Sequence, residues 1–242
     1  MFAALEAIEP DFAADLLPLA RNLSHVRTRA DQTGPELAAI IDEMDPVVAE
    51  VLGAGGEGSP LHVLTVGTFS VNAAVGQLGR DVAVFHCVEW FQTPQGERAL
   101  VAHETAHAYH RLVLGAAGLA PGDDDDLAWM LFSEGLATQV SRQADPNGAE
   151  TDYFWYGLPK MDGWVTWCAE NAEDLEKLAR EALDDPKAVE SFFGGGTVEG
   201  RWRTGHHLAD RLVAGLGTPL PELARLSVDD ARRVIRDALT PG

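Results

Sequence analysis

The pattern of apolar positions predicts two helices in the first 60 residues. Apolar side chains recur at helical spacing from about residue 11 to 29. They are Phe12, Leu16, Leu19, Leu23 and Val26. A second helical stretch runs from Pro35, a residue favoured in a first turn, to Leu52. Asp45-Pro46 is expected to break it, because a proline disfavours helical backbone in the residue before it. A glycine-rich loop, Gly53 to Pro60, follows.

Two strands and then a long helical region are expected after this loop. Leu61–Phe69 and Asp81–Val88 are rich in β-branched and aromatic residues, which favour strands, and Gly76 to Arg80 is expected to form a turn. From Thr93 onward the periodicity predicts helices over about 95–115, 124–143, 163–183, 186–193, 204–215 and 228–239. The fold class is therefore α+β and mostly helical. We expect a single domain, residues 1–242, with an upper lobe of about 1–117 and a helical lower lobe of about 118–242.

Composition narrows the range of partners. The 242 residues include 38 acidic and 18 basic side chains, giving a formal net charge of −20. Such a surface repels phosphate backbones and anionic lipids, so no nucleic-acid or membrane partner is expected. The N-terminus is acidic where a secretory signal is basic, and no apolar run approaches the ~18 residues of a membrane span. The two cysteines, Cys87 and Cys168, form no CxxC pair and are expected to be buried apolar residues. These features favour a cytoplasmic location.

One segment carries recognisable chemistry. Residues 103–107 read H-E-T-A-H within a strongly helical stretch. On a helix His103 and His107 are about 40° apart and one turn apart, so both imidazoles can bind one metal ion. Glu104 lies close enough on the helix to face a water at the same ion, as a general base must. The alternative is a pair of surface histidines beside a salt-bridging glutamate. Small residues on the other side of the helix favour a buried helix and the metal site.

A catalytic zinc requires a third protein ligand and one open position. Glu134 lies on the apolar face of the helix predicted around Trp129–Val140, where a carboxylate is costly unless a positive group meets it. Gly135 follows, and a close approach between two helices would explain a glycine at this point. The alternative is a surface glutamate at a cleft edge. His110 shares the face of the metal-binding histidines and is expected to lie behind them or to contact solvent.

The residues carry a family resemblance. HETAH, followed 27 residues after His107 by Glu134 in S-E-G-L-A, resembles the gluzincin metallopeptidases. More narrowly, it is similar to a bacterial family of predicted zinc-dependent proteases of unknown function that pairs HExxH with an E-G-L-A helix. The resemblance covers roughly residues 60–240. It implies a zincin-like fold with a small N-terminal sheet, an active-site helix and a helical C-terminal lobe. It also implies one Zn²⁺ per chain, held by His103, His107 and Glu134, with Glu104 as general base.

Two other zincin classes fit less well. A metzincin would carry glycine at position 110 and histidine at 113, where this chain has His110 and Val113. The stretch 151–157 is similar to the Asp-bearing loop of aspzincins, which makes Asp152 an alternative third ligand. However, Tyr156 follows Asp152 by four positions rather than three.

The expected reaction is peptide hydrolysis, with Glu104 taking the proton of the attacking water and passing it to the leaving amine. A second donor usually stabilises the oxyanion in such reactions. We rank His206 first for this role; the other candidates are His207, Tyr153, Tyr156, Arg201 and Arg203. The family often has aromatic residues where this chain has His206 and His207, so no tyrosine role is carried over to that helix. Both histidines could instead be ordinary helix-start residues.

The resemblance to gluzincins implies that the strand at Val82–Val88 lies at the sheet edge and pairs with an extended peptide. An ordinary core strand is the alternative. A peptide or protein substrate is thus the expected partner of a zinc metallopeptidase. Three alternatives remain: a non-catalytic zincin-fold binding protein, a zinc amidase acting on a non-peptide amide, and a helical protein that binds no metal.

Overall fold

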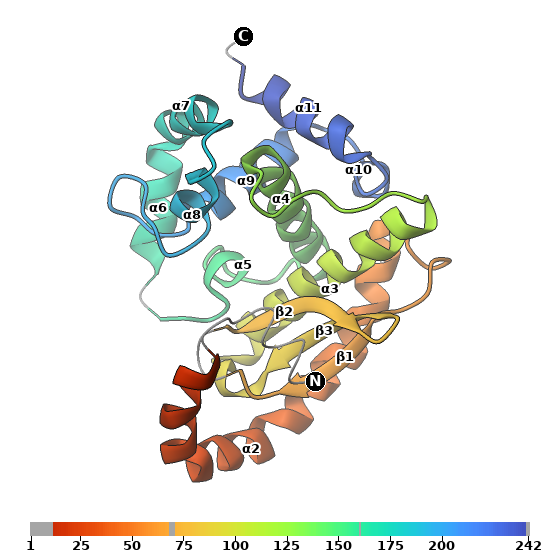
Figure 1. Ribbon diagram of the computed structural model, residues 1–242, viewed down its shortest axis with the longest axis vertical. Coiled ribbons are helices and arrows are strands. Elements are labelled where there is room, and N and C mark those ends of the chain that lie inside the picture. The colour runs from red at the N-terminus through yellow and green to blue at the C-terminus, as the bar shows by residue number, and fades with distance from the viewer. Residues whose placement is uncertain (1–11, 68–70, 160, 241–242) are drawn as a thin grey trace.

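The computed structural model describes residues 12–67, 71–159 and 161–240, without the side chains of residues 12–23 and 25. Its fold is α+β, with mostly helical segments around one small sheet (Figure 1). The strands are β1 (Leu61–Thr65), β2 (Ala73–Leu78) and β3 (Asp81–Cys87), followed by the 3-10 turn η1 (Val88–Trp90). The helices are α2 (Phe12–Leu52), α3 (Pro94–Ala116), α4 (Leu127–Ala144), α5 (Asp152–Trp155), α6 (Asp162–Glu170), α7 (Ala172–Ala182), α8 (Ala188–Phe192), α9 (Thr204–Gly215), α10 (Leu220–Leu223) and α11 (Val228–Ala238).

The first helix is longer than the sequence predicted. α2 is continuous over 41 residues, so the expected gap before Pro35 and the break at Asp45-Pro46 were wrong. Figure 1 shows that α2 curves along its length instead of ending. Buried residues on both sides of Pro46, including Met44 and Val48, pack in the main hydrophobic core. This burial offsets the hydrogen bond that the proline removes from the helix.

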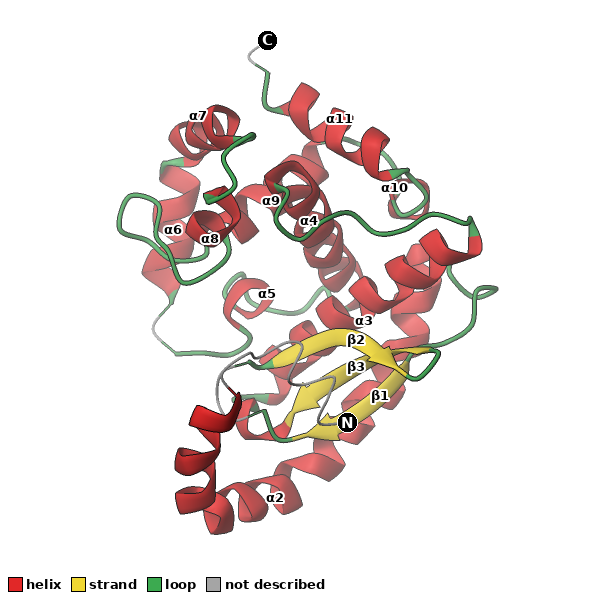
Figure 2. Cartoon of the chain, viewed as in Figure 1, coloured by secondary structure: helices red, strands yellow, loops and turns green. Residues whose placement is uncertain are grey.

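The sheet corrects a second prediction. Its strand order is β1-β3-β2, with β1 parallel and β2 antiparallel to β3 (Figure 2). The strand predicted at Val82–Val88 is therefore central and cannot receive a peptide at an edge. All residues from Ala83 to Cys87 are buried, as expected of a strand covered on both faces. The edge strands of the described sheet are instead β1 and β2, and β2 overlaps the segment predicted as a turn. The turn is confined to Gly79 and Arg80, where Gly79 has φ 68°.

Three helices carry the candidate site. α3 packs against α2 and the sheet on one side and against α4 on the other, and α4 packs against α9. Gly135 permits the contact between α4 and α9, because a Cβ there would lie 2.3 Å from the carbonyl oxygen of Ala209. The expected close approach at this glycine is thus confirmed.

The C-terminal half is confirmed as helical, with two differences. The helix predicted over 163–183 is divided at Asn171 into α6 and α7, and the short helices α5 and α10 were not predicted. Among the described residues, no helix is both long and apolar enough to cross a membrane.

Candidate metal centre

Helix α3 begins with a defined cap. The Thr93 side chain accepts a hydrogen bond from the backbone N–H of Gly96, and Pro94 occupies the first helical position. α3 then continues without interruption through His103 and His107. The two imidazoles lie one turn apart, and their Nε2 atoms are 3.1 Å from each other. Two ring nitrogens of neighbouring residues therefore converge on one point, as the H-E-x-x-H spacing predicted.

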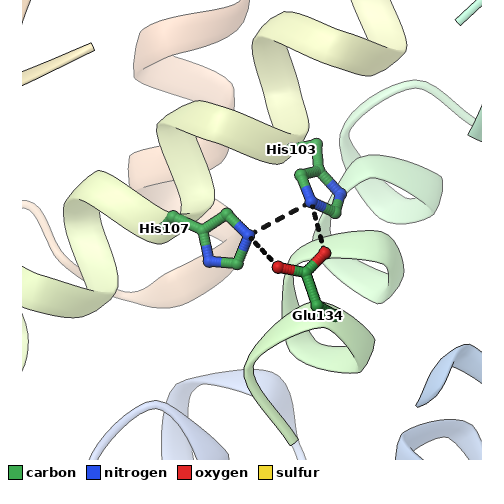
Figure 3. A group of neighbouring side chains, drawn as sticks. All are labelled: His103, His107 and Glu134. Carbon is green, nitrogen blue, oxygen red and sulfur yellow. Dashed lines mark hydrogen bonds and ion pairs between the residues drawn. The ribbon is translucent and has the colours of Figure 1, made fainter. Parts of the chain in front are cut away.

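The third member of the cluster comes from α4, which is capped by the Asp126 side chain. Figure 3 shows Glu134 pointing from α4 toward both imidazoles. Its Oε2 lies 3.1 Å from His103 Nε2, and its Oε1 lies 3.2 Å from His107 Nε2. One ligand atom from each of His103, His107 and Glu134 can be chosen so that all lie within 4.8 Å of one another. These three residues could hold a metal ion.

The spacing within the cluster fits a tetrahedral ion. Ligand atoms about 2.0–2.1 Å from a tetrahedral centre are about 3.3 Å from one another. The two imidazole nitrogens are 3.1 Å apart, close to that value, and each faces a different oxygen of Glu134, at 3.1 and 3.2 Å. Two imidazole nitrogens and one carboxylate oxygen are also the donors that zinc takes in catalytic sites.

The electrostatics of the cluster couple the carboxylate to the imidazoles. Burial favours a raised pKa for Glu134, but the charges and hydrogen bonds of His107 and His103 outweigh it and hold that pKa well below its usual value. Burial favours a lowered pKa for His107, and the neighbouring Glu134 carboxylate outweighs it, so that pKa is raised. The cluster therefore keeps an ionised carboxylate inside the protein, where it requires a compensating positive charge.

The Nδ1 atoms of the two imidazoles, which face away from the cluster, have different surroundings. The Nδ1 of His107 lies 3.3 Å from the Ser133 hydroxyl on α4, which orients that ring. The Nδ1 of His103 is buried without a hydrogen-bond partner in the described part of the chain. His103 is instead placed by packing, with the Tyr156 ring edge-on to it at a centroid distance of 5.9 Å.

The cluster opens into a cavity of about 410 Å³, here called the metal cavity. Glu104 lines it, and within the described chain its carboxylate has no hydrogen bond or ion pair. The edge strand β2 and the residue before it also reach this cavity, through Val75 and Asn72. A free carboxylate beside three ligand atoms in an accessible cavity is the arrangement that general-base chemistry requires.

The metal cavity is also lined by Tyr156, Arg203 and His206. The Nε2 of His206 is 3.3 Å from Glu134 Oε2 and 3.2 Å from the guanidinium of Arg203. Burial first, and then the Arg203 charge, hold the pKa of His206 well below its usual value, so this imidazole is neutral at pH 7. Burial raises the pKa of Tyr156, although the guanidinium of Arg203 favours the ionised hydroxyl.

Backbone conformation distinguishes two of these residues. In the described chain, the non-glycine residues with positive φ are Tyr156, Glu199 and Arg203. Tyr156 and Arg203 have φ of 52° and 57°, a left-handed conformation that costs bulky residues free energy. Gly96 on α3 accommodates the Tyr156 backbone, since a Cβ there would lie 2.4 Å from the Tyr156 carbonyl oxygen. Such strain is concentrated at functional sites.

Several other candidates from the sequence lie outside the metal cavity. Asp152 accepts a hydrogen bond from the backbone N–H of Ala149 and is not part of the ligand group. Tyr153 donates its hydroxyl to the Asp145 carbonyl oxygen, so it is used in packing. Arg201 lies over the Trp167 ring.

The neighbouring histidines also have separate surroundings. His207 lies beside the rings of Phe154 and Trp164, and it does not line the metal cavity. His110 does line it and is buried, stacked on Trp129 at 5.6 Å, so of the two positions expected for it only the solvent-exposed one was wrong. Burial lowers the pKa of His110 to about 3.

Asn72 and Val75 were missed because the strand that begins after Asn72 and carries Val75 was not predicted. Arg111 and Asp124, which also line the metal cavity, were missed as well. Arg111 lies four residues after His107, so helical periodicity alone places it near the same face and could have identified it.

Comparison with known proteins finds no matching family model, no matching curated protein and no matching solved structure.

Proposed function

We propose that this protein is a zinc-dependent metallopeptidase of the gluzincin type with a zincin-like fold. His103, His107 and Glu134 would hold one Zn²⁺, and Glu104 is the general base. The observation that carries the proposal is the free Glu104 carboxylate in the metal cavity, beside three ligand atoms spaced for one ion. A structural zinc is normally closed by four protein ligands, whereas three ligands and an open cavity are typical of catalysis.

The chemistry divides between the ion and the chain. When bound, zinc lowers the pKa of a water to about 7 and polarises the scissile carbonyl. Glu104 accepts the proton of the attacking water and delivers it to the leaving amine. The Tyr156 hydroxyl is the first donor to the developing oxyanion, because it lines the same cavity from a strained, fixed position.

His206 has the weaker claim to this role. Arg203 can only donate, so in its contact with Arg203 the Nε2 of the neutral His206 is the acceptor. The proton of that imidazole is then on Nδ1, which is buried without a partner among the described residues. His206 therefore positions Arg203 and supports the oxyanion site, with Tyr156 as the donor.

The free edge of β2 gives the substrate backbone a place to bind. Among the described residues β2 pairs with β3 on one side only, and it reaches the metal cavity through Val75. An extended peptide could add to this edge by main-chain hydrogen bonds. The peptide-binding strand expected at 82–88 is thereby replaced by β2.

The test compares zinc content and peptide cleavage in three proteins. Wild type should bind one zinc per chain by elemental analysis and cleave members of a peptide library detected by mass spectrometry. Glu104→Gln should keep the zinc and lose turnover by about 10²–10⁴-fold, the usual contribution of a general base. His107→Ala should lose both.

The controls separate the alternatives. Equal cleavage by wild type and Glu104→Gln would remove Glu104 from the mechanism. Zinc binding without cleavage of any library member would favour a non-catalytic binding protein or an amidase acting on another substrate. Equal zinc rebinding by chelator-treated wild type and His107→Ala would show that the metal site is wrong.

A further inference from the structure

A second cavity of about 300 Å³ lies beside the metal cavity. Asn72, Tyr156 and Arg203 line both cavities, so the two are neighbours across a shared wall. We refer to the second one as the Glu97 cavity, after the carboxylate that lines it. The proposed mechanism does not use this space.

Glu97 is a buried carboxylate without a partner. Its exposed fraction is 3%, and within the described chain its side chain makes no hydrogen bond or ion pair. It lies in the first turn of α3, where the helix dipole favours a negative charge. That position makes the charge tolerable, but it does not explain why the residue is buried in a cavity wall. A buried, unpaired carboxylate is costly and is rarely retained without a role.

The remaining lining is largely aromatic and apolar. It includes Trp90, Phe154, Trp155, Tyr156, Val71, Leu100 and Leu158, and its polar members are Asn72, Gln92 and Arg203. Aromatic faces attract guanidinium and ammonium groups, and apolar walls accept the methylene stems of arginine and lysine. A single carboxylate within such walls is the chemistry that recognises a long cationic side chain.

Two arginines lie near enough to be considered as internal partners. The guanidinium of Arg29 donates to the Phe91 carbonyl oxygen, and its charge lowers the pKa of Glu97 only in part. Burial dominates and raises that pKa to about 7. Arg203 lines the cavity, but its guanidinium contacts His206 and lies over the Trp155 ring. Neither arginine forms an ion pair with Glu97, so the carboxylate remains available.

The position of Glu97 relates this cavity to the reaction. Glu97 precedes Glu104 by seven residues, so the two side chains share a face of α3 about 10 Å apart along the axis. An extended peptide advances about 3.3–3.6 Å per residue. A residue next to the scissile bond could therefore reach Glu97 with a long side chain.

We propose that the Glu97 cavity is a specificity pocket that binds a cationic side chain of the substrate, an arginine or a lysine, through the Glu97 carboxylate. The substrate assignment rests on the proposed peptidase function, whereas the binding of a cation by this cavity does not. The net charge of −20 also attracts basic peptides to the molecule.

The test uses two small probes of nearly the same shape and different charge. Benzamidine carries an amidinium on an aromatic ring, and benzamide carries a neutral amide in its place. Binding to the purified protein, with and without added zinc, is measured by titration calorimetry, with intrinsic tryptophan fluorescence as a second readout. Wild type should prefer benzamidine by about 10- to 100-fold, as a charge-assisted hydrogen bond provides.

Glu97→Gln should abolish this preference while keeping zinc content and circular dichroism unchanged. Glu43→Gln, which removes an exposed carboxylate paired with Arg98, is the matched control and should keep it. Equal binding of the two probes by wild type, no binding of benzamidine, or an unchanged preference in Glu97→Gln would overturn the proposal. A Glu97→Gln protein that does not fold is replaced by Trp90→Ala, which should weaken both probes if they occupy this cavity.

A cleavage experiment then distinguishes the two proposals from each other. If the protein is a peptidase, wild type should favour library peptides with arginine or lysine near the cut, and Glu97→Gln should lose that preference by at least tenfold in kcat/KM. Selective benzamidine binding without any cleavage would support the cavity and contradict the peptidase. Cleavage without a preference for basic residues would support the peptidase and contradict the specificity pocket.

Discussion

At the scale of single residues, variants of Glu134 and Asp152 distinguish the proposed metal site from the alternative in which Asp152 is the third ligand. Its two oxygens contact both imidazoles, whereas Asp152 caps its own turn by accepting from Ala149. Glu134→Ala should lower zinc affinity by at least 100-fold, because only two histidines remain as ligands. Asp152→Ala should retain about one zinc per chain. Competition with a chromogenic chelator measures both affinities, and equal affinities in the two variants would contradict the Glu134 assignment.

Tyr156 is the residue that tests the oxyanion site. Tyr156→Phe keeps the ring against His103 and removes the hydroxyl. The loss of one oxyanion donor typically costs about 10²–10³ in kcat. We expect a loss of that size with unchanged KM and unchanged zinc content. His206→Gln should cost less, because in our proposal it only supports the guanidinium of Arg203. A larger loss of kcat in His206→Gln than in Tyr156→Phe would mean that His206 is the oxyanion donor and Tyr156 the supporting residue.

Local sequence was enough to find the candidate ligands but not their surroundings. His103 and His107 lie one turn apart on a single helix, so helical geometry alone brings them together. Glu134 could be inferred because a carboxylate on an apolar helix face needs a positive partner. Tyr156 and Arg203 meet only through tertiary folding, from segments 47 residues apart with unusual backbone conformations. No periodicity predicts such a pair.

At the scale of elements, the contact between α4 and α9 holds the carboxylate-bearing helix in place. Gly135 follows Glu134 directly, and a Cβ at this position would lie 2.3 Å from a backbone oxygen of α9. Gly135→Ala should therefore destabilise the fold by about 1–3 kcal/mol, since the backbone of Ala209 cannot move independently. Urea denaturation measures this loss, and zinc affinity should fall with it.

Gly215 provides the matched control on α9. A Cβ there meets nothing within 4 Å, and its φ is not positive. Gly215→Ala should leave stability unchanged or raise it by up to about 1 kcal/mol, because alanine reduces the freedom of the unfolded chain. Equal effects of the two substitutions would show that the close approach of α4 and α9 does not constrain the site.

The errors in the predicted elements have physical causes. β3 is apolar from Val82 to Phe85, which fits either a central strand or a covered edge, and only pairing on both sides decides between them. β2 carries Gly76 at its centre and few β-branched residues, so local preference favoured a turn. It forms a strand because β3 supplies its hydrogen bonds. The local preferences of Pro35 and Pro46 against helix were likewise overruled by tertiary burial.

At the scale of the whole molecule, buried titratable groups make stability depend on pH in two opposite ways. Burial, followed by the charge of His62, lowers the pKa of His86 to about 3. The unfolded chain binds a proton at that position below about pH 6.5, so stability from this group is lost as the pH falls from 6.5 toward 3. Glu97 acts in the other direction, because burial raises its pKa from 4.5 to about 7. Between about pH 4.5 and 7 the folded state keeps a proton that the unfolded chain has released.

Glu97 therefore gives the whole fold a testable cost at neutral and basic pH. Below pH 4.5 its carboxyl is protonated in both the folded and the unfolded state and has no effect on the balance. As the pH rises to 7 the unfolded chain ionises first, and the folded state loses up to about 3 kcal/mol relative to it. This pH window follows from the shift of the Glu97 pKa from 4.5 to about 7, with Arg29 and Arg203 as the charged groups nearby.

Glu97→Gln should therefore be more stable than wild type at pH 8 and equally stable at pH 4, in urea denaturation at constant ionic strength. The exposed control Glu43→Gln should show no such gain. A difference between Glu97→Gln and wild type that is the same at both pH values would mean that Glu97 is not held in a desolvated cavity. A gain at pH 8 would mean that folding retains a costly carboxylate at this position, which is the pattern expected of a group kept to bind a cation.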